Sequence, residues 1–189
     1  MAMQSTMMPL GTPAPDFDLE DVVSGQRVDL AAVSGSSALV VIFFCNHCPY
    51  VKHLQDGLVA FGNDYRDRDV AIVAISSNDA DAYPDDSPAR LAAVAQELGY
   101  PFPVLFDADQ DVAKAYTAAC TPDFFLFGSD GALAYRGRFD ESRPNSGASV
   151  TGADLRAAVD ALLDGRSPTE DQHPSVGCSI KWKPGNEPT

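Results

Sequence analysis

The chain has 189 residues, and its 45% apolar content is typical of one folded domain rather than of a disordered segment. Its 27 acidic and 13 basic residues give a net charge of −14, and such a surface repels the phosphates of nucleic acids and of anionic lipids. We therefore expect neither nucleic acid nor a membrane as a partner.

The N-terminal segment and the cysteine count bear on the compartment. Residues 1–17 have no cationic start and no apolar run of secretory length, and the apolar window 38–44 is too short to span a bilayer. We expect a cytoplasmic location. The four cysteines, at positions 45, 48, 120 and 178, are too few for a secreted disulfide scaffold and indicate redox chemistry or metal binding instead.

The first part of the chain predicts a hairpin, a buried strand and a helix. Residues 17–19 and 27–30 resemble the arms of a small N-terminal β-hairpin. Residues 38–44 are apolar on both faces and rich in β-branched side chains, as in a central parallel strand. Pro49 suits the first turn of a helix, which apolar residues at helical spacing continue to Tyr65.

The rest of the chain alternates strands with helices and then adds a second hairpin. The predicted elements are a strand (70–75), a helix (87–98), a strand (104–106), a helix (110–118), a hairpin (123–136) and a helix (151–165). Thr151 is expected to cap the last helix. The acidic run 78–86 lacks the pattern of a calcium-binding loop and is expected to be a solvated loop.

This order of elements predicts an α/β fold in one domain. The alternating middle implies parallel strands, and the late hairpin adds antiparallel ones, so we expect a central mixed sheet flanked by helices. The domain is expected to comprise residues 1–165. Residues 166–189 are dense in proline, serine and glycine and form a C-terminal tail, which Ile180 and Trp182 indicate folds back and packs on the same domain.

The motif Cys45-Asn46-His47-Cys48 stands between a buried strand and an amphipathic helix. A two-residue spacer lets two sulfurs form a disulfide, and the positive end of the helix dipole favours the reactive thiolate. We expect Cys45 at an exposed helix tip to be the nucleophile and Cys48 to be the resolving thiol. His47 as an imidazolium would stabilise the thiolate; the alternative is a solvent-exposed spacer histidine without electronic effect.

Zinc binding is the alternative interpretation of this motif. The ligands would be Cys45 and Cys48 with two of His47, His53, His173, Cys120 and Cys178. The sequence has no second CxxC and no HxxxH pair, so we expect no metal site.

A proline precedes the strand predicted at 123–127. This residue is Pro122, in the run Cys120-Thr121-Pro122-Asp123. Because proline has no N–H to donate to a neighbouring strand, it must stand at the first residue of a strand that is otherwise internal. Here the sequence resembles the thioredoxin superfamily, in which a cis-proline loop faces the CxxC and docks the substrate. The resemblance implies that Thr121 and Pro122 dock the substrate and that Cys120 lies near the mouth of the active site.

Residues 43–52, 120–127 and 177–183 together are similar to the peroxiredoxin-like branch of that superfamily. The branch groups with the alkyl-hydroperoxide-reductase/thiol-specific-antioxidant and ResA/TlpA-type proteins. The resemblance covers about residues 17–183 and implies a thioredoxin-like fold and thiol chemistry. The peroxiredoxin motif Pro-x-x-x-Thr/Ser-x-x-Cys is absent, because Ala38 and Ile42 hold its places before Cys45.

The leading hypothesis is a thiol–disulfide oxidoreductase acting on a protein or small-molecule thiol or disulfide. No dissociable cofactor is expected, but an upstream reductase must reset the dithiol. The alternatives are a thiol peroxidase of peroxiredoxin type and a non-enzymatic binding module on the same scaffold. Cys120 and Cys178 form either a second thiol pair near the active site or two buried free thiols.

Overall fold

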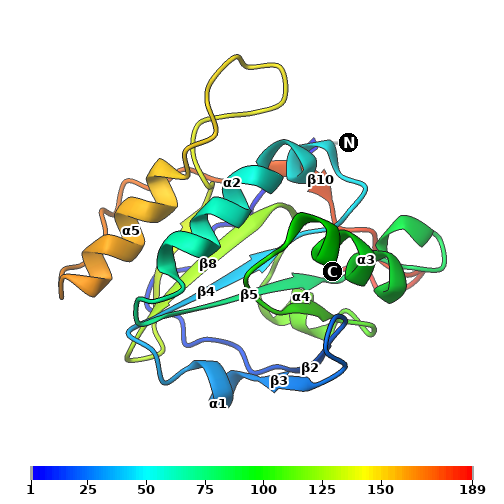
Figure 1. Cartoon of the computed structure of the whole chain (residues 1–189), viewed down its shortest axis with the longest axis horizontal. Helices are drawn as coiled ribbons and strands as arrows, with labels where there is room; N and C mark the ends of the chain where they lie inside the picture. The colour runs from blue at the N-terminus through cyan, green and yellow to red at the C-terminus, as the bar shows by residue number, and fades with distance from the viewer. Residues whose placement is uncertain (1, 189) are drawn as a thin grey trace.

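A seven-stranded mixed sheet runs through the middle of the molecule (Figure 1), in a computed structural model that describes residues 2–188. Its strands, in the order in which they lie side by side, are β3 (Arg27–Asp29), β2 (Asp18–Asp21), β6 (Val104–Phe106), β5 (Val70–Ser76), β4 (Ala38–Phe43), β8 (Asp123–Gly128) and β9 (Leu133–Gly137). The central strands β4, β5 and β6 are parallel, and the other pairings are antiparallel.

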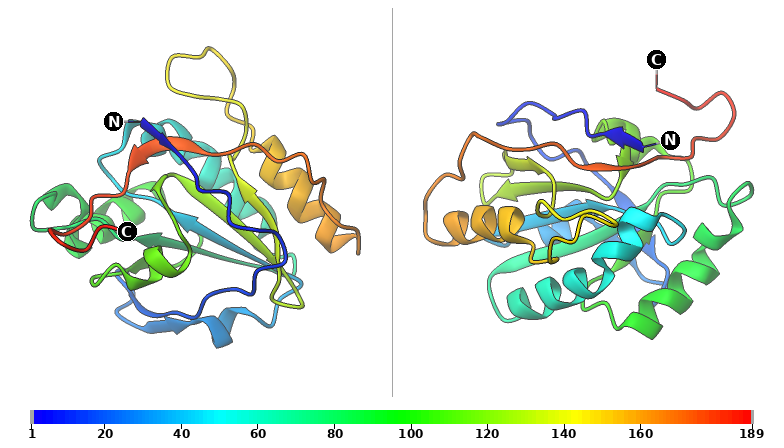
Figure 2. Two further views of the ribbon diagram at one scale, coloured as in Figure 1. Left: turned by 180° about the vertical axis from the view of Figure 1, so that it is seen from behind. Right: turned by 90° about the horizontal axis from the view of Figure 1, so that it is seen from above.

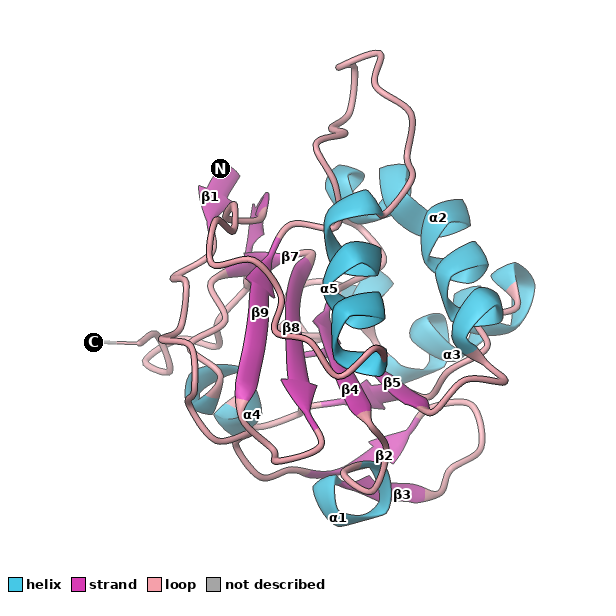
Figure 3. Ribbon diagram, turned by 90° about the vertical axis from the view of Figure 1, so that its left-hand side faces the viewer, coloured by secondary structure: helices cyan, strands magenta, loops and turns pink. Residues whose placement is uncertain are grey.

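Three long helices cover one face of this sheet, as Figure 3 shows. They are α2 (Pro49–Tyr65), α3 (Pro88–Leu98) and α5 (Ala153–Leu163). The short helix α4 (Asp111–Ala115) and the N-terminal segment pack on the opposite face. Helix α1 (Leu30–Val33) follows β3, and a 3-10 turn at Pro84–Asp86 precedes α3. Every residue of β4 is buried because the strand is covered on both faces.

A second, three-stranded sheet joins the two ends of the chain. It consists of β1 (Ala2–Gln4), β10 (Val176–Ser179) and β7 (Cys120–Thr121), all antiparallel. Seen from behind, β1 and β10 lie side by side on the face opposite the long helices (Figure 2). The C-terminal segment therefore folds back on the body next to the start of β8.

The predicted thioredoxin-like α/β fold, with its mixed sheet and its N-terminal hairpin, is confirmed. Two details differ. The helix predicted at 110–118 ends earlier, where Thr117 takes a φ of 49°. The predicted cap of α5 is wrong: Gly152 is the N-cap residue, and the carboxylate of Asp140 accepts hydrogen bonds from the N–H groups of Thr151 and Gly152.

The strand β1 was not expected from the sequence, because its three residues are exposed and pair only with the distant β10. The division into a domain of residues 1–165 and a tail of residues 166–189 stays a prediction. Within residues 2–188, every helix is too short or too polar to cross a membrane.

Candidate active site

The two cysteines of the motif lie where β4 ends and α2 begins. Cys48 is the N-cap residue of α2, with an extended backbone, and Pro49 occupies the first helical position. Both thiols are free. The expectation of an exposed Cys45 is wrong, since both cysteines have 0% of their surface exposed.

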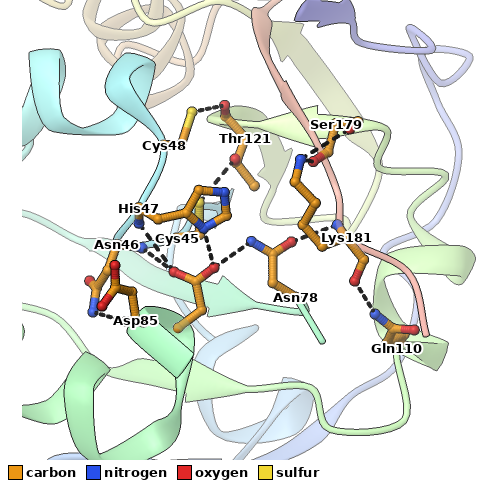
Figure 4. Close-up of polar contacts among 11 residues, drawn as sticks. Cys45, Asn46, His47, Cys48, Asn78, Asp85, Gln110, Thr121, Ser179 and Lys181 are labelled. Atoms are coloured by element: carbon orange, nitrogen blue, oxygen red, sulfur yellow. Dashed lines mark hydrogen bonds and ion pairs between the residues drawn. The ribbon is translucent and has the colours of Figure 1, made fainter. Parts of the chain in front are cut away.

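The loop before β8 packs directly on this pair. The peptide bond between Thr121 and Pro122 is cis. The hydroxyl of Thr121 lies 3.3 Å from Cys45 Sγ, and the thiol of Cys48 donates a hydrogen bond of 3.2 Å to the Thr121 carbonyl. Thr121 thus meets two cysteines that precede it by 76 and 73 residues (Figure 4). Their role in docking a substrate stays a prediction.

The C-terminal strand closes the site from the same side. β10 pairs with β7 in a register that sets Cys178 opposite Thr121, and it contacts α2. Cys178 packs against the buried cluster that contains both cysteines of the motif. The burial of Cys45 and Cys48 therefore involves the tail, which the local sequence around the motif does not reveal.

The two sulfurs of the motif differ in acidity. The pKa of Cys48 is lowered to about 4, first by a hydrogen bond from the Cys45 thiol and further by Cys178 and the N–H of Val51, while burial opposes the shift. The pKa of Cys45 is raised, first because its thiol is the donor to Cys48 and then by burial and the carboxylate of Asp86. Within the reduced pair, Cys45 therefore holds its proton more tightly than Cys48, and the hydrogen bond from Cys48 to the Thr121 carbonyl exists only while Cys48 keeps its own proton.

A buried carboxylate organises the spacer of the motif. Asp86 has 0% of its surface exposed, and its Oδ1 accepts hydrogen bonds from the N–H groups of Asn46 (2.8 Å) and His47 (3.2 Å). Its Oδ2 lies 2.5 Å from His47 Nδ1 and accepts a bond of 2.8 Å from the side chain of Asn78. His47 is therefore held by a partner and is not a free spacer side chain.

The expectation that residues 78–86 form a solvated loop is wrong at its two ends. Asn78 and Asp86 are buried, and the side-chain oxygen of Asn78 accepts a hydrogen bond of 2.8 Å from the N–H of Lys181 in the tail. A sequence signal does exist: Asn78 follows β5, and neighbouring parallel strands bring the residues after them to the same edge of a sheet.

One group of side chains has the composition of a metal site. A ring nitrogen of His47, a carboxylate oxygen of Asp86 and Sγ of Cys45 lie within 4.8 Å of one another. Both oxygens of Asp86 already accept hydrogen bonds from protein donors, which fits an internal network better than an ion. Within residues 2–188, the other zinc ligands considered belong to no group of three; they are Cys48, His53, His173, Cys120 and Cys178.

The two remaining cysteines lie on neighbouring strands but differ in their surroundings. Cys120 is buried, its thiol donates to the carbonyl of Pro122 at 3.7 Å, and burial raises its pKa. Cys178 is half-buried, and burial followed by the Cys48 sulfur raises its pKa to about 11. Cys120 is paired in register with Ser179 and Cys178 with Thr121, so the two cysteines lie on opposite faces of the small sheet, and Cys178 packs on the cluster that contains Cys48.

A cysteine pair at the start of a helix, opposite a cis-proline loop in a thioredoxin-like fold, places the chain in the thioredoxin superfamily. The chain belongs to the AhpC/TSA family, whose model matches residues 10–136. It is also 26% identical over 129 residues to the thiol-disulfide oxidoreductase ResA of Bacillus subtilis (strain 168), covering 65% of this chain and 64% of ResA. The chain therefore spans less than two thirds of that relative.

Solved structures agree with this placement. An uncharacterized conserved protein from Geobacillus kaustophilus is 56% identical, with 98% of each chain covered and a TM-score of 0.96. A hypothetical protein from Sinorhizobium meliloti 1021 is 50% identical, with 96% of this chain and 99% of that one covered and a TM-score of 0.94. A secreted disulfide oxidoreductase of Mycobacterium tuberculosis shares the fold alone, at 18% identity over 79% of this chain and 95% of its own, with a TM-score of 0.58.

Proposed function

We propose that this protein is a thiol–disulfide oxidoreductase whose working pair is Cys45 and Cys48. The observation that carries the proposal is the pair itself: two free thiols that lie where β4 meets α2 and both contact Thr121, one of them at the N-terminus of the helix. A helix N-terminus stabilises a thiolate, and a thiolate is the species that attacks a disulfide. The chain belongs to the AhpC/TSA family and has an oxidoreductase relative, which is in keeping with this chemistry.

The order of attack in this proposal reverses the one expected from the sequence. Cys48, which is the N-cap residue of α2 and has the lowered pKa, attacks a disulfide sulfur of the substrate and forms a mixed disulfide while the other substrate sulfur leaves as a thiolate. Cys45 then loses its proton and attacks Cys48 Sγ, which completes the Cys45–Cys48 disulfide and releases the second substrate thiolate. Two protein thiols are oxidised and one substrate disulfide is reduced.

His47 and Asp86 serve the second step. The imidazole lies in the group that contains Cys45 Sγ, and the carboxylate fixes the ring through Nδ1. In our proposal His47 accepts the proton of Cys45 as that thiol attacks, and Asp86 is a positioning residue. This role differs from the one expected from the sequence, in which His47 as an imidazolium stabilises the thiolate, and the sequence did not indicate the partner Asp86.

Thr121 and Pro122 are proposed to receive the substrate chain, and the hydroxyl of Thr121 stabilises the sulfur of Cys45. The substrate is a protein or small-molecule thiol or disulfide, and a separate reductase returns the pair to its reduced state. The exchange needs no dissociable cofactor. A cytoplasmic setting remains part of the proposal.

Catalysis of exchange in both directions tests this function. The full chain should accelerate the reduction of insulin by dithiothreitol or the oxidation of a dithiol peptide by oxidised glutathione. Cys45→Ser and Cys48→Ser should abolish the acceleration, and Cys120→Ala, which removes a buried thiol outside the pair, should retain it. A wild-type chain that accelerates neither reaction contradicts the proposal.

Two parallel assays examine the alternatives. Peroxide consumption that disappears in Cys45→Ser would indicate a thiol peroxidase. Stoichiometric zinc in freshly purified protein, with neither thiol of the motif open to alkylation, would indicate a metal-holding binding module.

A further inference from the structure

A third thiol lies beside the working pair. Cys178, in β10, is paired in register with Thr121, whose carbonyl lies 3.2 Å from Cys48 Sγ, and it packs on the buried cluster that contains Cys45 and Cys48. Cys48 interacts with both Cys45 and Cys178, so the three sulfurs form a row with Cys48 in the middle. We propose that Cys178 is a third redox thiol, which exchanges a disulfide with Cys48 and links the buried pair to thiols outside the protein. The proposal rests on the proposed function and adds the route by which substrates reach the pair.

The tail is fixed at the position that this exchange requires. Cys178 is paired in register with Thr121, and the next residues are tied down by hydrogen bonds from Ile180 N–H to the Ala119 carbonyl (3.1 Å) and from Lys181 N–H to Asn78 (2.8 Å). The first of these partners lies just before β7 and the second just after β5. The sulfur of Cys178 is thereby held over Cys48 by backbone pairing and not by a chance side-chain contact.

The glycine before Cys178 shows how closely the strand approaches the loop. A Cβ atom at Gly177 would lie 2.0 Å from the Thr121 carbonyl oxygen and 3.1 Å from the nitrogen of Pro122. Any other residue would push β10 away from β7, because both contacts are with backbone atoms. The residue at 177 thus permits the docking that brings Cys178 to Cys48.

Access to solvent differs along the row of sulfurs. Cys45 and Cys48 are both fully buried, whereas Cys178 is only half-buried. A substrate that meets the protein with its tail docked therefore reaches the sulfur of Cys178 before the other two. Direct attack by Cys48 on a substrate would require the tail to leave.

The exchange balances without a further reactant. In the reduced protein, Cys178 attacks an external disulfide and releases one substrate thiolate; Cys48 then attacks Cys178 Sγ and releases the second. Cys45 attacks Cys48 Sγ last, forming the Cys45–Cys48 disulfide and returning Cys178 to a thiolate, which takes up a proton. The steps run in reverse when the oxidised pair meets external thiols.

The charge around Cys178 changes in step with this cycle. Its pKa is raised by burial and also by the hydrogen bond and the charge of Cys48, while Lys181 lowers it. Once Cys48 is bonded to Cys45, its sulfur carries no charge and that contribution is lost. Cys178 is therefore a better nucleophile when the pair is oxidised, which favours the reverse direction, in which Cys178 attacks Cys48 and the protein oxidises external thiols.

Disulfide mapping by alkylation and peptide mass spectrometry tests the inference on the full chain. Samples treated with oxidised glutathione should contain Cys45–Cys48 in the wild type and Cys48–Cys178 in Cys45→Ser. Cys45→Ala is measured alongside, because serine would bury a hydroxyl at that site. The rate at which Cys178→Ser reacts with oxidised glutathione should fall about tenfold or more. In this variant glutathione reaches Cys48 only when the tail is undocked, and minor conformers such as the undocked state are populated at about 10% or less.

The outcomes separate this inference from the proposed function. If the wild type forms Cys45–Cys48 while Cys178→Ser exchanges as fast as the wild type and as the control Cys120→Ala, the third thiol is not used and only this inference is overturned. A disulfide between Cys178 and Cys120 in Cys45→Ser would overturn it as well. If the wild type forms no disulfide at Cys45 or Cys48, both proposals are wrong.

Discussion

The carboxylate of Asp86 lies 2.5 Å from Nδ1 of His47, across 39 residues of chain. The same carboxylate binds the N–H groups of Asn46 and His47, so it fixes both the ring and the backbone of the CxxC spacer. Through Asn78 it is also connected to Lys181 in the tail. One buried side chain thus links the motif, the loop after β5 and the C-terminus.

Replacement of this carboxylate should affect both stability and reactivity. Asp86→Ala leaves buried N–H donors without an acceptor, which lowers the free energy of unfolding by about 3 kcal/mol. Asp86→Asn keeps the shape but removes the charge that raises the pKa of Cys45, so the pH midpoint for alkylation of Cys45 should fall. Urea unfolding and the pH dependence of alkylation measure the two effects.

The exposed neighbour Asp85 provides the control for these variants. Asp85→Asn removes one charge from the same turn, and the carbonyl that binds Asn46 remains. Its stability and its pH profile should match those of the wild type. Equal effects of Asp85→Asn and Asp86→Asn would mean that only the overall charge of the loop matters.

The hydroxyl of Thr121 should assist the reaction of Cys45. Thr121→Val keeps the side-chain shape and the carbonyl that binds Cys48, but it removes the hydroxyl 3.3 Å from Cys45 Sγ. The exchange rate should fall about fivefold, corresponding to one hydrogen bond of about 1 kcal/mol. Thr121→Ser retains the hydroxyl and should react close to the wild-type rate. A valine variant as fast as the serine variant would exclude this role.

Docking of the tail should control access to the buried thiols. Gly177→Ala places a Cβ against the backbone of Thr121 and should undock β10, so alkylation of Cys48 in the reduced protein accelerates about tenfold or more. Gly35→Ala, whose Cβ would meet no atom within 4 Å, is the matched control. Unchanged alkylation in Gly177→Ala would show that the tail does not cover the site.

A buried carboxyl at the start of β8 should make the stability depend on pH. Both oxygens of Asp123 are buried without a hydrogen-bond partner of ordinary geometry among residues 2–188, although Ser175 and the N–H of Phe124 lie nearby. Burial raises its pKa well above the ordinary value of 3.8. The folded protein therefore binds this proton more tightly than the unfolded chain does.

The sign of the pH effect follows from that difference. The contribution of Asp123 to stability is greatest below pH 3.8 and is lost as the pH rises toward the folded-state pKa. Asp123→Asn cannot ionise, so it should be more stable than the wild type at pH 7 by about 1–3 kcal/mol and nearly equal to it at low pH. Urea midpoints over a pH series measure this; a difference that does not change with pH would contradict it.

Much of the fold could be predicted from local patterns. The β4 strand, the proline at the start of α2 and the hairpin of β2 and β3 all follow from residues close together in sequence. That the CxxC and the proline before β8 face each other was also predicted, but from a family resemblance and not from local patterns, because this contact joins distant parts of the chain.

The parts of the site that sequence reasoning missed depend on distant partners. The run ending in Asp86 has the composition of a solvated loop, and only its contact with His47 gives it another role. The tail that packs on the cluster containing Cys45 joins β7 more than fifty residues after that strand. The sequence left open whether Cys178 pairs with Cys120 or is a free thiol, and only the pairing of β10 with β7 brings it close to Cys48.

The most direct test of the central claim is an equilibrium redox titration of the full chain, with Cys45 and Cys48 alkylated and quantified by mass spectrometry at each potential. We predict that both thiols convert together in one two-electron transition at a potential between about −270 mV and about −120 mV. A value near the lower limit would identify a reductase and one near the upper limit an oxidant. Thiols at positions 45 and 48 that stay reduced across this whole range would contradict the account.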